Sequence, residues 1–295
     1  MSAKTFAQKA TAFSKLRPAY FKPIIALVRG LSDPIVGLSM GQTTEEIAYR
    51  FGITREQMDA FSVTSHQRLG AATDNGNLHE IEAIYDNAGA YFDADDGIRR
   101  DSSIESLAKL KPYFDRIYGM VTPGNSAQIT DGAAMLLLAS ADAVKKYNLP
   151  VLAKIKDSQW AGLNPSQMGL GPAHAMAPIM QRNKFSISDI DNWEINEAFA
   201  GQVLGCIEAW KQDDYCQQQL GLEKALGEIP HDKLNIDGGG ISIGHPVGAS
   251  GARIVLHVAN TLKRTNTKRG IASLCIGVGQ GGAMLIESAT SVGGA

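Results

Sequence analysis

The most glycine-rich stretch of the chain, residues 235–251, holds a histidine in its middle. Six of its seventeen residues are glycine, which indicates backbone at positive φ or backbone packed where no Cβ fits. Pro246 restricts His245 to an extended conformation, so this histidine is predicted to lie outside a helix. Residues 252–264 have helical apolar spacing, and Ser250 suits the N-cap of that helix. The pattern predicts an imidazole on a rigid turn at a helix start; the alternative is a glycine-rich connection with an incidental histidine.

Cys275 and Asn196 each end a predicted strand. Cys275 closes a short apolar run and is followed by a glycine-rich turn. Catalytic groups of layered α/β folds often lie at such strand ends, although a cysteine on an apolar strand is more often part of the core. Asn196 stands between a short strand and a helix, where a helix cap is the simpler explanation. Together with the histidine, these residues are candidates for acid–base chemistry.

Several motifs of the sequence occur in one order. They are Gly37-Leu38-Ser39-Met40-Gly41, Asn125 with Asp131-Gly132-Ala133-Ala134, Asn-Glu-Ala-Phe at 196–199, Gly-His-Pro at 244–246, Gly-Ala-Ser-Gly-Ala-Arg at 248–253 and Cys-x-Gly-x-Gly at 275–279. In this order and spacing the sequence resembles thiolases, with the closest likeness to the 3-ketoacyl-CoA thiolases of β-oxidation and their acetyl-CoA acetyltransferase relatives. The resemblance begins near residue 30 and covers nearly all of the chain beyond it.

The resemblance implies a role for each candidate residue. His245 would activate a nucleophilic thiol and later help to hold the thioester oxygen. Cys275 would exchange a proton with the incoming CoA thiol or the departing carbanion, which requires neighbouring amides and helix ends to lower its pKa. Asn196 would position a water that completes an oxyanion hole with His245, and the backbone amide of Gly277 would serve a second hole.

The resemblance also implies the substrate site. Coenzyme A would be a substrate, so no cofactor is expected, and the histidines and cysteines lack the spacing of metal ligands. The residues expected to contact the acyl group or CoA are Met40, Ser158, Met168 and Gly244.

One difference from thiolases stands out in the sequence. Thiolases carry the acyl group on a cysteine in their N-terminal half, but this chain has only Cys206, Cys216 and Cys275. Neither Cys206 nor Cys216 has the small-residue context of that nucleophile. The sequence therefore predicts an incomplete fold of the thiolase-like layered αβαβα type, an α/β class, that lacks the N-terminal segment with the nucleophile. The expected domains are a loop domain at 1–120, a remnant of the N-terminal half at 121–160 and the C-terminal domain at 161–295.

Three functions remain open at this point. The first is a thiolase-type acyl-CoA acyltransferase for thiolysis or for condensation of acetyl-CoA, inactive alone because the acyl-carrying cysteine is missing. The second is a non-catalytic thiolase-like module that binds CoA or a protein partner. The third is another acyl-CoA enzyme, such as a hydrolase. The expected partners are acyl-CoA and CoA, a second copy of the chain or a separate N-terminal thiolase fragment, and a β-oxidation hydratase/dehydrogenase subunit.

The composition narrows the class of protein. The net charge of −2 over 295 residues argues against general nucleic-acid binding. Three cysteines indicate a reducing compartment, and a cytoplasmic location is expected. The first thirty residues contain six lysines or arginines and no acidic residue. This basic segment is typical of a solvated surface; a targeting presequence, a membrane-surface patch or a site for a phosphate or partner subunit are the alternatives.

The remaining patterns predict the elements that position these residues. Capping boxes at Thr43–Glu46 and Thr54–Gln57 predict two helices, the second ending near Asn75-Gly76. Residues 1–40 are expected to be irregular or partly helical, and 212–232 are the least predictable. Beyond residue 130 the sequence predicts strands at 135–138 (buried), 151–156, 192–196, 270–275 and 281–287, and helices at 141–147, 171–182, 197–211 and 249–264. Their alternation indicates α/β layers.

Overall fold

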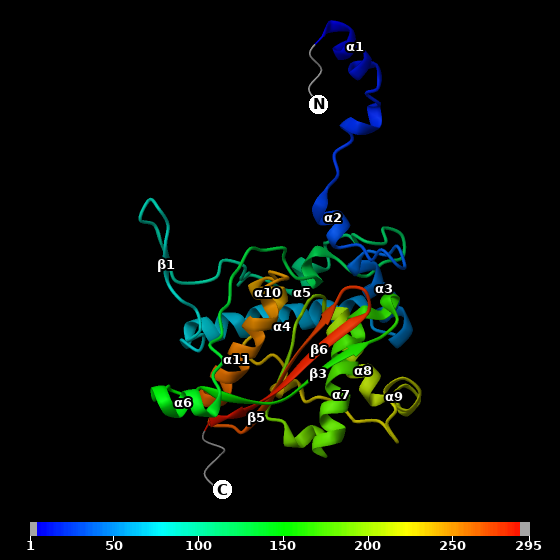
Figure 1. Cartoon of the computed structure of the whole chain (residues 1–295). Coiled ribbons are helices and arrows are strands. Elements are labelled where there is room, and N and C mark those ends of the chain that lie inside the picture. Colours follow the sequence, from blue (N-terminus) through cyan, green and yellow to red (C-terminus); the bar gives the residue numbers. More distant parts are fainter. Residues whose placement is uncertain (1–4, 290–295) are drawn as a thin grey trace.

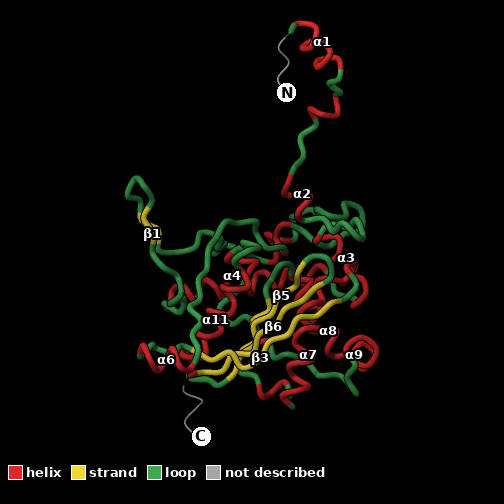
Figure 2. The backbone as a smooth tube through the Cα atoms, in the orientation of Figure 1, coloured by secondary structure: helices red, strands yellow, loops and turns green. Residues whose placement is uncertain are grey.

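The computed structural model describes residues 5–289, and an N-terminal arm extends away from the body that the rest of these residues form (Figures 1 and 2). A twisted sheet lies in the middle of the body with helices on both of its faces. This mixed α/β architecture agrees with the fold class predicted from the sequence.

Four strands form the central sheet in the order β3-β6-β5-β4. Strands β4 (Asn192–Ile195) and β5 (Arg269–Ile276) are parallel, whereas β6 (Gln280–Ser288) is antiparallel to both β5 and β3 (Ala153–Gly162). All four strands were predicted, although β3 is longer than the expected 151–156. Because β4 and β5 are parallel, their carboxyl ends lie at the same edge of the sheet.

Helices cover both faces of the sheet. Helix α11 (Ser250–Thr265) packs against β5 and β6 through a cluster that includes Ile254, Val258 and Ala272. Ile271, the neighbour of Ala272, belongs instead to the larger cluster formed with α7 and α8. Successive side chains of a strand point to opposite faces, so α11 lies on one face and α7 and α8 lie on the other.

Helices α7 (Gly171–Asn183) and α8 (Ala200–Lys211) form the second layer with α3 (Met40–Phe51), and all three were predicted. The α7 helix begins so close to β6 that only glycine fits there. A Cβ at Gly281 would lie 2.1 Å from the carbonyl oxygen of Gly171, a distance that no side chain tolerates. The glycines of the last sequence motif therefore allow strand and helix to touch.

The two predicted capping boxes have different outcomes. Thr54 caps α4 (Arg55–Asp74) with Gln57 as predicted, and the helix ends at Asn75. The box predicted at Thr43 is wrong: Ser39 and Gln42 cap α3, so Thr43 lies inside the helix. The hydroxyl of Thr43 bonds the carbonyl of Met40 within the helix, which satisfies it without a cap.

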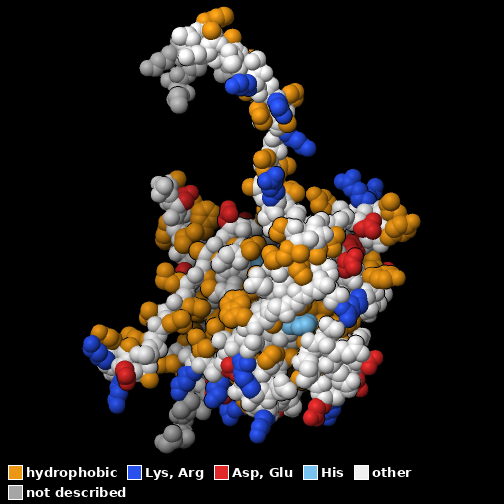
Figure 3. Space-filling view, turned by 45° about the vertical axis from the view of Figure 1, so that its right-hand side comes forward, with side chains coloured by type: hydrophobic (Ala, Val, Ile, Leu, Met, Phe, Trp, Pro, Cys, Tyr) orange, Lys and Arg blue, Asp and Glu red, His pale blue; other side chains and the backbone are white. Residues whose placement is uncertain are grey.

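Residues 5–30 form the arm. It carries α1 (Phe6–Ser14), the 3-10 turn Pro18–Phe21 and α2 (Ala26–Gly30), which matches the prediction of irregular and partly helical structure. Phe6 and Phe21 are 89% and 73% exposed, so the arm has apolar as well as basic side chains in solvent. Figure 3 shows this mixture of hydrophobic and basic groups away from the body.

The prediction of a buried strand at 135–138 is wrong. Met135, Leu137 and Leu138 are 87%, 84% and 71% exposed and belong to no strand. In the described part of the chain no strand runs beside this segment, so its backbone has no ladder to join and its side chains have no face to pack on. The helix that follows, α6 (Ala141–Tyr147), forms as predicted.

The other described elements are short or peripheral. They are β1 (Ile84–Tyr85), β2 (Tyr91–Phe92), α5 (Ile104–Leu107), α9 (Asp213–Leu220), α10 (Gly240–Ile243) and 3-10 turns at Pro123–Asn125, Pro165–Leu170, Ile187–Asp189 and His231–Lys233. Within residues 5–289, no helix combines the length and the apolar character that a membrane crossing requires.

Candidate active site

The parallel strands β4 and β5 bring two of the candidate residues to one edge of the sheet. Ile195, the last residue of β4, is in register with Ser273, and the amide of Asn196 donates a hydrogen bond of 2.9 Å to the Ser273 carbonyl. Cys275 lies two residues further along β5. Asn196 and Cys275 are therefore both at the carboxyl end of these strands, where ligands of α/β sheets usually bind.

His245 reaches this edge from the glycine-rich segment. Helix α10 ends at Ile243, and Gly244 has φ +105°, a conformation that side chains rarely adopt. His245 follows outside any helix, as predicted from Pro246, and its amide donates to the carbonyl of Gln128 over 3.0 Å. The turn thus points the imidazole toward the sheet edge rather than along a helix.

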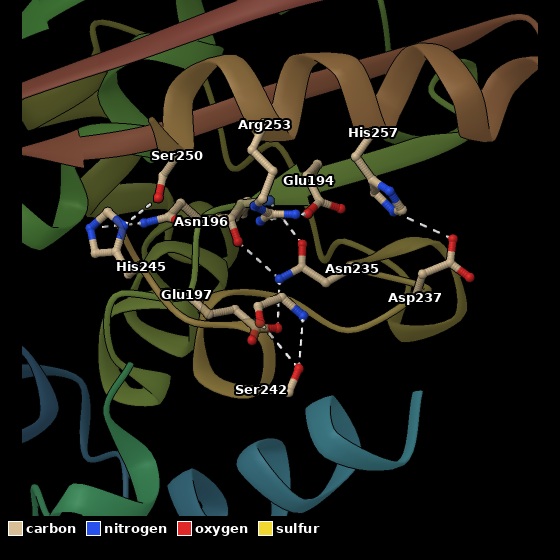
Figure 4. Close-up of polar contacts among 12 residues, drawn as sticks. Glu194, Asn196, Glu197, Asn235, Asp237, Ser242, His245, Ser250, Arg253 and His257 are labelled. Carbon is tan, nitrogen blue, oxygen red and sulfur yellow. Dashed lines mark hydrogen bonds and ion pairs between the residues drawn. The ribbon is translucent and has the colours of Figure 1, made fainter. Parts of the chain in front are cut away.

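The imidazole of His245 lies between two polar side chains (Figure 4). Its Nε2 is 3.4 Å from Asn196 Nδ2, and its Nδ1 is 2.6 Å from Ser250 Oγ. Burial, followed by the nearby positive charge of Arg253, lowers the pKa of His245 to about 4. The ring is therefore neutral at pH 7 and able to accept a proton.

Ser250 does not cap α11, contrary to the prediction. Ala249 occupies the N-cap position and no side chain caps this helix end. The hydroxyl of Ser250 is committed to His245 and to the carbonyl of Pro246 instead. In the same way Asn196 caps no helix, since α8 begins at Ala200 rather than near the expected residue 197.

Cys275 differs from the expectation in its acidity. The thiol is buried, and this burial raises its pKa to about 12, whereas the proposed chemistry required a lowered pKa. The protein environment alone does not favour a thiolate at this position, because desolvation outweighs the backbone hydrogen bond to the sulfur. At neutral pH Cys275 holds its proton and is an acid rather than a base.

The turn after Cys275 has an unusual backbone at Val278, whose φ is +66°. Such a value is a real outlier for a β-branched residue. Asp33 stabilises the turn: its Oδ2 accepts from the Val278 amide at 3.1 Å, and its Oδ1 accepts from the amides of Ile35 and Val36. The position of the Gly277 backbone is therefore fixed by a residue from the far N-terminal part of the chain, which the sequence did not indicate.

A buried carboxylate underlies the site and was not predicted. Glu197 accepts hydrogen bonds from Ser65 Oγ at 2.6 Å, Asn235 Nδ2 at 2.8 Å and the amide of Ile241 at 3.2 Å. A Cβ at Gly239 would lie 2.5 Å from the carboxyl carbon of Glu197. The glycines at 238–240 therefore allow the backbone to wrap around this side chain, which ties the histidine loop to the residue after Asn196 (Figure 4).

A second buried pair lies to the right of His245 in Figure 4, next to α11. Glu194 and Arg253 are 3.6 Å apart, and neither oxygen of Glu194 has a hydrogen-bond partner. Burial raises the pKa of Glu194 to about 7, against the opposing effects of His257 and Arg253. The motif Gly-Ala-Ser-Gly-Ala-Arg predicted neither contact, although both Ser250 and Arg253 belong to it.

The residues expected to bind substrate are dispersed. Met40 begins α3 and is partly buried, Met168 is 6% exposed beside the start of α7, and Ser158 is exposed on β3. Gly244 lies against Thr130, 2.6 Å from where its Cβ would be. Gly244 adjoins the histidine in the sequence, and the substrate-binding roles of all four residues stay predictions.

Cys206 and Cys216 are buried in the helical layer. Cys206 donates to the carbonyl of Gly169 at 3.3 Å, and burial raises its pKa to about 12. Burial also raises the pKa of Cys216. Neither thiol is presented to a substrate, in agreement with their sequence context. Within residues 5–289 no group of three or more histidine, cysteine or acidic side chains is placed to hold a metal ion.

The fold and this site define the class of protein. It is a layered α/β protein in which Asn196, His245 and Cys275, from three segments of the chain, lie at the carboxyl ends of two parallel strands. Comparison with known families identifies the family to which this protein belongs. The family model for the thiolase N-terminal domain matches residues 1–142, and that for the thiolase C-terminal domain matches residues 149–288. The chain belongs to the thiolase family.

Individual relatives agree with this assignment. The 3-ketoacyl-CoA thiolase of Serratia proteamaculans (strain 568) is 35% identical over 288 residues, which are 97% of this chain and 65% of that protein. The crystal structure of the acetyl-CoA acetyltransferase of Bacillus anthracis superposes with a TM-score of 0.78 at 34% identity, covering 92% of this chain and 68% of that one. Human mitochondrial 3-ketoacyl-CoA thiolase in complex with CoA gives 0.77 at 33% identity, covering 92% and 66%.

The comparisons correct one expectation. An N-terminal segment was predicted to be missing, but the N-terminal domain model matches from residue 1 to residue 142. The chain spans about 65% of the length of the curated relatives it matches. The expected incomplete fold and the expected inactivity both rested on that absence, and neither is supported by these matches. The domain boundaries at 120 and 160 stay a prediction.

Proposed function

We propose that this protein is a thiolase-type acyltransferase that acts on 3-ketoacyl-CoA, by thiolysis or by the reverse condensation of acetyl-CoA. The observation that carries the proposal is the contact between Asn196 and a neutral His245 at the carboxyl end of β4 and β5. The names of the relatives support the substrate class, and one of the similar structures contains CoA.

In this proposal each residue acts through a property that the structure gives it. The neutral imidazole of His245 takes the proton of a thiol. Asn196 positions a water that completes an oxyanion hole with His245. The thiolate that forms attacks the 3-keto carbon, and the bond between carbons 2 and 3 breaks. Cys275, whose thiol is protonated, donates its proton to the carbanion that leaves and recovers a proton from the incoming CoA thiol. The amide of Gly277 serves the oxyanion, on a turn that Asp33 holds in place.

The covalent step also needs a thiol that carries the acyl group. Cys206 and Cys216 are buried with raised pKa values, so the acyl group is expected on neither. Mass spectrometry of the protein after incubation with acetoacetyl-CoA locates any acyl group directly. An acyl adduct on Cys206 or Cys216 would contradict this assignment.

Thiolysis of acetoacetyl-CoA by free CoA tests the function. We expect H245N to lower turnover at least about a hundredfold, because a general base contributes that much or more. H174N is the matched control: His174 is also partly buried and hydrogen-bonded, but to Tyr215 in the helical layer. Turnover that survives H245N, or acyl-CoA binding by the wild-type protein without turnover, would overturn the proposal.

The location and the assembly of the protein are proposed from other features. The three cysteines are unpaired, which supports a reducing compartment, and we propose a cytoplasmic location. The exposed apolar side chains between residues 129 and 138 support a homo-oligomer. Association with a β-oxidation hydratase/dehydrogenase subunit rests on the family alone.

A further inference from the structure

Ser250 stands at the centre of a short chain of hydrogen bonds that ends on the imidazole of His245. Its Oγ is 2.6 Å from His245 Nδ1 and 3.1 Å from the carbonyl oxygen of Pro246. The serine is fully buried. On the other side of the ring, Nε2 faces Asn196 Nδ2 at 3.4 Å. Both ring nitrogens therefore face polar side chains (Figure 4).

The chemistry of these groups sets the direction of the hydrogen bonds. The hydroxyl of Ser250 donates its single proton to the Pro246 carbonyl, which also accepts from the backbone amides of Ala249 and Ser250. The serine oxygen then accepts from Nδ1–H of His245. The amide of Asn196 turns its nitrogen, a donor, toward Nε2 at 3.4 Å, which favours Nε2 as the nitrogen without a proton. This arrangement of protons pairs the serine hydroxyl, the Pro246 carbonyl and both ring nitrogens, and it leaves the buried Oδ1 of Asn196 without a hydrogen-bond partner among the described residues.

We propose that Ser250 is a positioning residue that fixes the tautomer of His245 with the proton on Nδ1, so that Nε2 is the basic nitrogen. This inference rests on the proposed function for its catalytic meaning. It goes beyond that function because it assigns a residue that does not touch the reacting atoms and states which nitrogen does the chemistry.

The tautomer matters only because the ring is neutral. Burial and the positive charge of Arg253, which lies one turn after Ser250 on α11, hold the pKa of His245 near 4. At pH 7 the ring therefore carries one proton, and its location decides which nitrogen is a base. In free histidine the proton prefers Nε2, so the protein must supply the contacts that reverse the preference.

The consequence for the reaction is a defined proton transfer. The lone pair of Nε2 takes the proton of a thiol as the S–H bond breaks, which leaves a thiolate and an imidazolium. The Nδ1–H bond stays in place throughout and remains hydrogen-bonded to Ser250. The serine oxygen therefore stabilises the positive charge that forms on the ring, as an orienting third group does in other nucleophile–base pairs.

Nitrogen NMR tests the proposal without any need for turnover. Long-range proton–nitrogen correlation of the uniformly labelled protein distinguishes the protonated from the unprotonated nitrogen of each neutral histidine, and H245N assigns the signals. We expect a protonated Nδ1 and an unprotonated Nε2 in the wild-type protein at pH 7. In S250A we expect a shift toward protonated Nε2, and in S250T, which keeps the hydroxyl, the wild-type pattern.

S273A is the matched control. Ser273 is also fully buried and its hydroxyl donates to the carbonyl of Gly282 at 2.8 Å, away from the histidine. The S273A variant loses one buried hydroxyl that does not contact His245, so the nitrogen signals of His245 should stay those of the wild type. A protonated Nε2 in the wild-type protein, or an unchanged pattern in S250A, would overturn the proposal.

Kinetics separate this inference from the function on which it rests. In the thiolysis assay we expect S250A to lower kcat at least about tenfold with little change in KM, and S250T to recover most of it. If the wild-type protein shows no turnover but the NMR pattern is as expected, the proposed function fails and the tautomer assignment stands. If turnover is normal in S250A, the positioning role is wrong.

Discussion

Replacing His257 with glutamine tests whether buried charges under α11 stabilise the fold. His257 Nδ1 lies 2.5 Å from Glu80 Oε1, and its Nε2 lies 3.4 Å from Asp237 Oδ2. Burial by itself lowers the pKa of His257, but the hydrogen bonds to Asp237 and Glu80 outweigh it and raise the pKa to about 10. At neutral pH the ring is therefore a buried cation between two carboxylates from separate segments.

The structure gives the size of the effect in two ways. Removing one partner of a buried ion pair costs roughly 3 to 5 kcal/mol, since the other charge stays buried. The rise of the pKa from 6.5 to about 10 corresponds to roughly 5 kcal/mol, because a tenfold change in proton affinity is about 1.4 kcal/mol. We expect H257Q to lower the free energy of unfolding by about 3 to 5 kcal/mol near pH 6. Asp237 keeps Arg264 and Asn77 as partners, so most of the loss falls on Glu80.

The effect has a defined pH dependence. A histidine whose pKa is raised in the folded state contributes its full stabilisation below its unfolded pKa of about 6.5. That contribution is lost as the pH rises through about 10, where the folded ring also loses its proton. The stability difference between wild type and H257Q should therefore be largest near pH 6 and should shrink steadily toward pH 10.

Urea unfolding followed by circular dichroism between pH 6 and pH 10 measures this difference. R100Q is the control, because the Arg100–Asp74 pair has a similar distance of 2.8 Å but both side chains are more than half exposed. Solvent screens such a pair, so R100Q should leave the unfolding curve nearly unchanged at every pH. An H257Q curve like that of R100Q, or a difference that grows with pH, would refute the reasoning.

Three further outcomes follow from burial and contact. G239A should destabilise the protein by about 2 kcal/mol or more in urea unfolding, because the new Cβ would meet the carboxyl group of Glu197. G162A is the control and should leave the stability nearly unchanged, because its Cβ would meet nothing within 4 Å. Cys275 should react slowly with iodoacetamide at pH 8 in the native protein and rapidly in urea, since burial holds its pKa near 12; fast native alkylation would contradict the burial. Light scattering should show a dimer or larger assembly that covers residues 129–138, and a stable monomer that binds no apolar dye would show that this surface needs no partner.

Local rules in the sequence determined the frame of the site. Pro246 excluded His245 from a helix, and Thr54 with Gln57 fixed where α4 begins, because such effects act within a few residues. The alternation of apolar runs predicted the strands and helices that bring Asn196 and Cys275 to one sheet edge. Periodicity gives the element type, and parallel pairing then places the strand ends together.

The tertiary structure alone decided what each polar group contacts and how it ionises. Ser250 suited a helix cap by type, yet its hydroxyl binds the imidazole of His245, a contact that the local pattern did not indicate. Residues 135–138 had the composition of a buried strand, but burial requires a partner surface, and none covers them in residues 5–289. The high pKa of Cys275 has the opposite cause, because desolvation of a thiol depends on its burial in the folded chain, which its position on an apolar strand did not reveal.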